Sequence, residues 1–133
     1  MSSSTVGPTI AELAAALAAG RTTSVALTED ALARIDRHMQ AGGAAFMSVD
    51  AKGALAQAHA ADQARAAGYV TSPLAGLPVS IKDLFDVRGQ VTRAGSKALD
   101  GSAPAQADAP AVARLRAAGA VLIGRTNMSE FAF

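Results

Sequence analysis

A chain of 133 residues is the size of one domain. Half of the residues are hydrophobic but only 4% are aromatic, so the core should consist of closely packed alanine-rich elements. The net charge is +1 with both signs interspersed, and there is no cysteine. This composition excludes disulfides, cysteine nucleophiles and thiolate metal sites, argues against direct nucleic-acid binding, and fits a cytoplasmic protein.

The N-terminal part is predicted to be helical. Residues 1–8 lack the basic start of a signal peptide and are expected to be a disordered lead-in. Thr9 is placed to cap an amphipathic helix over residues 10–19, whose apolar run is too short to cross a membrane. A second amphipathic helix is predicted over residues 24–40.

A short strand and a third helix follow. The strand is predicted over residues 45–49, and Asp50 is expected to cap a helix that continues to about residue 67. His38 and His59 fall on separate predicted helices, so we expect them to be surface residues rather than metal ligands. No metal or cofactor is therefore predicted.

The next strand is marked by strict alternation between apolar and polar side chains. It covers Leu77, Pro78, Val79, Ser80, Ile81 and Lys82. Lys82 lies where the strand gives way to a turn. From these residues alone, the favoured interpretation is that Lys82 pairs with the adjacent Asp83 at the sheet edge. The alternative is a lysine that is held in place for chemistry.

The segment after this strand is irregular and rich in glycine. Thr92 and Ser96 are each expected to cap local backbone groups, an interpretation that we favour over a role in a pocket. Asp108 is expected to cap a fourth helix, which has Pro110 in its first turn and ends at Gly119.

The C-terminal residues predict one more strand and the start of another helix. A buried strand is expected over residues 120–123, and Asn127 with Glu130 has the spacing of a capping box. Helices that alternate with strands predict an α/β fold, a mixed sheet sandwiched between helices. Because the last helix is cut off after one turn, residues 9–133 are interpreted as the N-terminal part of a larger domain.

Three blocks of this sequence resemble the amidase signature family. They are residues 74–83, which contain the Pro-Val-Ser-Ile-Lys-Asp run, residues 94–96, and residues 108–131. The blocks occur in the family's order, so the likeness covers nearly the whole chain. Arg93 stands where many members carry a small residue, which leaves the substrate preference open.

The resemblance implies the amidase signature fold and hydrolysis of amide bonds. Members use a serine nucleophile, a second serine with a cis peptide bond, and a lysine. Lys82 matches that lysine and is the only catalytic residue that carries over. Both serines belong to a glycine- and serine-rich segment that also supplies the oxyanion hole, and the chain is truncated before it. Ser80, Ser96 and Ser129 do not match that segment.

The proposed lysine chemistry adds two structural expectations. A lysine accepts a proton only when it is neutral, whereas the pKa of a free lysine is about 10.4. Burial lowers the pKa of lysines by up to several units, so we expect Lys82 to be buried. The carboxylate of Asp83 must also point away from Lys82, as strand alternation allows. We expect Asp83 to bind backbone amides in the turn.

Several functions remain open from the sequence. The favoured one is an amidase that acts on a small-molecule amide, or the amide-hydrolysing subunit of a tRNA-dependent amidotransferase. In either case the 133-residue chain alone should be inactive. Schiff-base chemistry at Lys82 is a different enzyme class that also uses a neutral lysine, and a truncated non-catalytic module is the non-enzyme alternative. No membrane association is expected, and a homodimer is compatible with this interpretation.

Overall fold

A small mixed β-sheet forms the centre of the computed structural model, which describes residues 7–133. Its strands are β1 (Phe46–Val49), β2 (Pro78–Lys82) and β3 (Val121–Thr126), in the order β1-β3-β2. The central strand β3 runs parallel to β2 and antiparallel to β1. The predicted mixed sheet is confirmed, whereas the predicted lead-in falls largely on residues 1–6, which lie outside the described residues.

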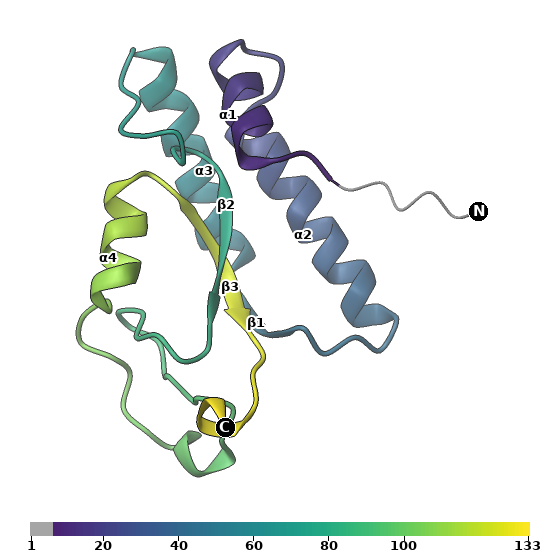
Figure 1. Ribbon diagram of the computed structural model, residues 1–133, viewed down its shortest axis with the longest axis vertical. Helices are drawn as coiled ribbons and strands as arrows, with labels where there is room; N and C mark the ends of the chain where they lie inside the picture. Colours follow the sequence, from purple (N-terminus) through teal and green to yellow (C-terminus); the bar gives the residue numbers. More distant parts are fainter. Residues whose placement is uncertain (1–6) are drawn as a thin grey trace.

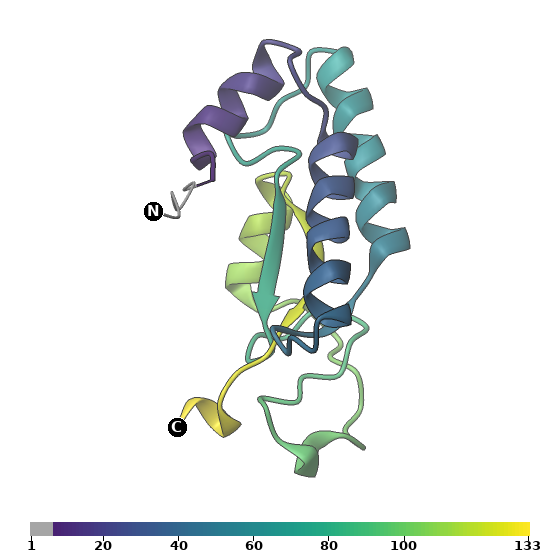
Figure 2. The same ribbon diagram turned by 90° about the vertical axis from the view of Figure 1, so that its right-hand side faces the viewer.

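Helices cover both faces of this sheet. In Figures 1 and 2, α2 (Ser24–Gln40) and α3 (Ala51–Ala66) lie on one face and α4 (Pro110–Ala117) lies on the other. The short helix α1 (Ile10–Ala18) precedes α2. This arrangement confirms the predicted layers and the approximate bounds of all four helices.

Alternate residues of β3 enter two separate hydrophobic clusters. Val121 and Ile123 pack against Ile35 of α2 and against the alanines Ala54 and Ala58 of α3. Leu122 packs with Ile81 and with Val112 of α4. Because successive side chains of a strand point to opposite faces, one central strand joins both layers of the core.

The strand β3 is longer than the sequence predicted. It continues through Gly124 and Arg125 to Thr126, three residues beyond the expected end. Ser48 of β1 pairs with Arg125, and Lys82 of β2 pairs with Thr126. A glycine and an arginine do not resemble a buried strand, but the pairing on both sides holds them in one.

Two predicted helix caps are confirmed. The Thr9 hydroxyl accepts a hydrogen bond from the Glu12 N–H at 3.2 Å, and the Glu12 carboxylate accepts one from the Thr9 N–H at 2.7 Å. The Asp50 carboxylate accepts a hydrogen bond from the Gly53 N–H at 2.9 Å. Both residues satisfy N–H groups that have no partner inside the helix.

The predicted cap at Asp108 is wrong. The helix α4 begins after Ala109 without a side-chain cap. The Asp108 carboxylate instead accepts hydrogen bonds from the Arg88 N–H at 2.8 Å and from Arg116 Nε at 2.7 Å. These contacts connect the loop before α4 to the helix itself. The Arg88 N–H, with a smaller contribution from Arg116, lowers the pKa of Asp108.

This lowered pKa predicts a pH-dependent effect of Asp108→Asn. A carboxylate whose pKa is lower in the folded state stabilises that state above its unfolded pKa of about 3.9, and the effect is lost at lower pH. We therefore expect the variant to be less stable than the wild type at pH 6, with a difference that shrinks toward pH 3. Urea unfolding at several pH values measures this difference. A difference that stays constant over this range would contradict the prediction.

Candidate active site

Lys82 is the last residue of β2, and its Cα pairs with Thr126 at the end of β3. Its side chain lies on the strand face that Ser80 shares, opposite to the buried Ile81. Lys82 is exposed, and its amine forms no ion pair with any residue from 7 to 133. The expected burial of Lys82 is therefore wrong for this chain, because no element in the described range covers that end of β2.

Asp83 is held by Arg125 rather than by Lys82. The Oδ1 atom of Asp83 accepts hydrogen bonds from Arg125 Nε at 3.0 Å and from Arg125 Nη2 at 2.8 Å. Side-chain exposure is 1% for Asp83 and 4% for Arg125. The favoured pairing of Lys82 with Asp83 is thus wrong. Asp83 points away from Lys82 as the chemistry requires, but its partner is a guanidinium and not the backbone amides of the turn.

Backbone hydrogen bonds fix the chain on both sides of Asp83. The Asp83 N–H donates to the Thr126 carbonyl at 3.0 Å, and the Asp83 carbonyl accepts from the Ala94 N–H at 2.9 Å. The Ala94 carbonyl in turn accepts from the Phe131 N–H at 2.7 Å. These bonds hold the end of β2, the loop around Ala94 and the C-terminal segment together beside Lys82.

Gly95 allows the loop to approach the C-terminal segment closely. Its φ is +70°, in the left-handed region that favours glycine, and an added Cβ would lie 2.7 Å from the Met128 carbonyl oxygen. A larger residue at this position would therefore push the two segments apart.

The two hydroxyls of this loop have different roles. Ser96 accepts a hydrogen bond from the Ala98 N–H at 3.3 Å, which confirms its local capping role. It also donates to Glu130 Oε1 at 2.6 Å, a contact that links it to the C-terminal segment. The predicted local capping by Thr92 is wrong, because its hydroxyl donates to the Asp86 carboxylate at 2.7 Å.

The predicted capping box of Asn127 and Glu130 is also wrong. The last element is a short 3-10 turn, η2 (Glu130–Ala132), without a side-chain cap. The amide of Asn127 donates to the Ala44 carbonyl at 3.0 Å, and Glu130 binds Ser96. Both side chains are used to hold segments that are distant in the sequence.

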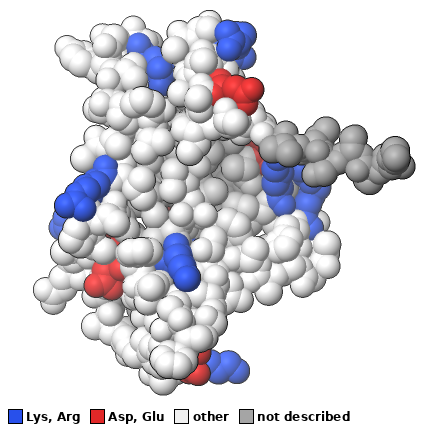
Figure 3. Space-filling model, in the orientation of Figure 1, with Lys and Arg blue, Asp and Glu red and all other residues white. Residues whose placement is uncertain are grey.

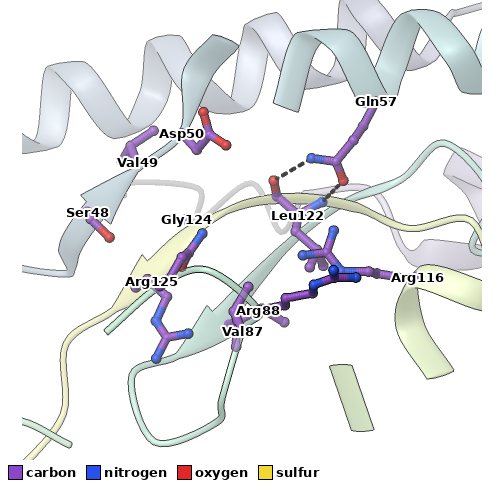
Figure 4. A pocket seen from close by; sticks show the side chains of 12 residues that line it. Ser48, Val49, Asp50, Gln57, Val87, Arg88, Arg116, Leu122, Gly124 and Arg125 are labelled. Carbon is purple, nitrogen blue, oxygen red and sulfur yellow. Dashed lines mark hydrogen bonds between the residues drawn. The ribbon is translucent and has the colours of Figure 1, made fainter. Parts of the chain in front are cut away.

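A polar pocket of about 360 Å³ lies elsewhere on the chain (Figure 4). Lys82 is not among its lining residues, which include Arg88, Arg116 and Arg125. At its upper side in Figure 4, Gln57 binds the backbone N–H and carbonyl of Leu122. Ile81, the residue before Lys82, also lines it, so the pocket lies on the face of β2 opposite to the candidate lysine.

The described part of the chain contains no cluster of three or more side chains that could hold a metal ion. Over residues 7–133, no helix is long and apolar enough to cross a membrane. Figure 3 shows basic and acidic side chains in small, separate groups on the face drawn there.

The family model described as Amidase matches residues 26–133. The chain belongs to the amidase family. The predicted resemblance to amidase signature enzymes is thereby confirmed.

Known relatives of this amidase family chain are enzymes or parts of enzymes. The A subunit of glutamyl-tRNA(Gln) amidotransferase from Streptomyces coelicolor is 48% identical over 93% of this chain and 24% of its own length. AtzE, which is one subunit of 1-carboxybiuret hydrolase from Pseudomonas sp. strain ADP, is 47% identical over 92% of this chain and 26% of its own. The chain thus spans about a quarter of the length of these relatives.

Solved structures support the same amidase fold. The inhibitor-bound vestigial protein complex of an s-triazine catabolic enzyme has a chain that matches with a TM-score of 0.87 and 46% identity. The match covers 95% of this chain and 27% of that chain. The small mixed sheet and its helices are therefore a part of the amidase signature fold.

Proposed function

We propose that the full-length protein hydrolyses amide bonds by a Ser-cisSer-Lys mechanism and that this chain supplies the lysine, Lys82. The observation that carries the proposal is the position of its amine. Lys82 lies exposed at the end of β2, and Arg125 binds the carboxylate of the next residue, Asp83. The amine therefore has no ion-pair partner among residues 7–133. In the proposed mechanism it receives the proton of a serine.

The proposed reaction is an acyl transfer in two stages. The nucleophilic serine oxygen attacks the amide carbon while its proton passes through the second serine to Lys82. The C–N bond then breaks, the nitrogen leaves with a proton, and the acyl group remains on the serine as an ester. Water hydrolyses this ester in the second stage. The serines and the oxyanion donors would come from residues outside the 133-residue sequence.

The substrate class that we propose is a small-molecule amide. The AtzE relative is named as part of a hydrolase of 1-carboxybiuret, which supports a small substrate. The alternative is the amide-hydrolysing subunit of a tRNA-dependent amidotransferase, which is supported by the names of several relatives. Both kinds of relative are named as subunits, so the proposal also includes a partner chain, beside a homodimer.

A fluorophosphonate probe, which labels activated serines, tests the reaction class. We expect the full-length protein to be labelled on a serine outside the 133 residues. Treatment with borohydride and a carbonyl compound should give no adduct on Lys82, because the proposed role of this lysine is proton transfer. Labelling and trapping are both measured by peptide mass spectrometry. An adduct on Lys82 together with no serine label would contradict the proposal and favour Schiff-base chemistry.

A further inference from the structure

We propose that Asp83 and Arg125 act as a positioning pair, which fixes the end of β2 so that the amine of Lys82 is held in place for proton transfer. This inference rests on the proposed function of Lys82. The two residues are 42 positions apart in the sequence, and both side chains are buried. Neither residue is placed in contact with the reacting atoms.

Asp83 is held by hydrogen bonds at three groups, which are its carboxylate, its N–H and its carbonyl. Two nitrogens of the Arg125 guanidinium donate to the same oxygen, Asp83 Oδ1, at 3.0 and 2.8 Å. The Asp83 N–H and carbonyl are bound to Thr126 and Ala94, respectively. Side chain and backbone are therefore both anchored at the residue that directly follows Lys82. Hydrogen bonds between charged groups are about twice as strong as those between neutral ones.

The pair also connects the lysine to the neighbouring strand and loop. Arg125 lies on β3, where its Cα pairs with Ile81, the residue before Lys82. Its Nη2 atom is 3.4 Å from the Thr92 hydroxyl, which binds Asp86. The residues on both sides of Lys82 are thus tied to the same arginine, and a shift of Arg125 would move the backbone that carries the lysine.

The charges of the pair give a reason for its placement. An unpaired carboxylate at the buried position of Asp83 would be strongly unfavourable. Without Arg125, the chain would relax by moving that carboxylate toward water or toward the amine of Lys82. Either movement would displace Lys82 or pair it with a carboxylate. Arg125 therefore keeps the Lys82 amine from pairing with Asp83 and also holds the backbone of Lys82 in place.

The test compares variants of the full-length protein by the kinetics of fluorophosphonate labelling, which separates the rate constant of reaction from probe binding. We expect Arg125→Met to lower the rate constant about 100-fold, since small displacements of a reacting group cost this much, with binding changed less than about twofold. Arg34→Met is the matched control, because it removes another arginine–aspartate pair, the exposed Arg34–Asp30 pair within α2. It should leave the rate constant unchanged.

A double variant separates positioning from stability. Asp83→Asn with Arg125→Met removes both buried charges, so the thermal unfolding midpoint should recover relative to Arg125→Met, whereas the rate constant should not. Recovery of both quantities together would overturn the proposal, as would a folded Arg125→Met protein with a normal rate constant. Lys82→Ala is measured in parallel. If Lys82→Ala is labelled at the normal rate, the proposed function of Lys82 fails. If Lys82→Ala loses labelling but Arg125→Met does not, only the positioning role of the Asp83–Arg125 pair is refuted.

Discussion

Replacement of Lys82 by arginine in the full-length protein is expected to lower the rate of amide hydrolysis by about 10²- to 10⁴-fold, the usual contribution of a general base. Arginine keeps the positive charge and the hydrogen-bond donors of lysine, but it is not deprotonated in proteins. If Lys82 accepts a proton, Lys82→Arg should therefore be as impaired as Lys82→Ala. Steady-state hydrolysis of a chromogenic anilide at pH 7 measures the effect.

The chain offers a matched control for this substitution. Lys52 is an exposed lysine on α3, and Lys52→Arg should leave the rate unchanged. A Lys82→Arg protein with a nearly normal rate would mean that Lys82 acts only through its charge. In that case the amine would not be the base, and the proposed mechanism would need another proton acceptor.

The 133-residue chain by itself is expected to show no amide hydrolysis. It contains Lys82, the proposed base, whereas the proposed nucleophile and oxyanion donors would come from residues outside it. A base without a nucleophile has no covalent step to assist, and oxyanion donors alone commonly contribute about 10²- to 10³-fold. The measurement is anilide hydrolysis by highly purified chain, with Lys82→Ala of the same chain as the control. Turnover that disappears in the Lys82→Ala chain would contradict this prediction.

Local patterns in the sequence predicted most of the fold. The alternation that ends at Lys82 located β2, and Thr9 and Asp50 cap their helices as expected. Each of these features depends on residues within one or two turns of the chain, where spacing alone determines which groups meet. The same holds for the order of helices and strands, which implied a mixed sheet between helical layers.

The failed predictions concern polar side chains whose partners are distant in the sequence. Asp108 binds the backbone of Arg88, 20 positions away, and Asn127 binds the carbonyl of Ala44, 83 positions away. A short polar residue near a helix start satisfies local groups only when no better partner is folded against it. Spacing gives no information about such partners, so these predictions required the tertiary structure.

Arg125 is the residue of the site that sequence reasoning missed, although a signal was present. It follows a run of buried apolar residues in β3, and a buried arginine requires an acidic partner. The sequence also places Asp83 at the end of the neighbouring predicted strand. The burial of Lys82, in contrast, depends on elements that cover its face of the sheet, and its own strand pattern carries no information about them.

The place of β3 in the sequence has a consequence for synthesis on the ribosome. The central strand is the last of the three to be made, about 70 residues after β1. At about 5 to 20 residues per second, this separation corresponds to a delay of roughly 4 to 14 s. During that interval the nascent chain presents β1, joined by β2 about 40 residues before β3, without the neighbour that pairs with both. Unpaired strands bind other chains readily, so chaperone protection of these two strands matters during this interval.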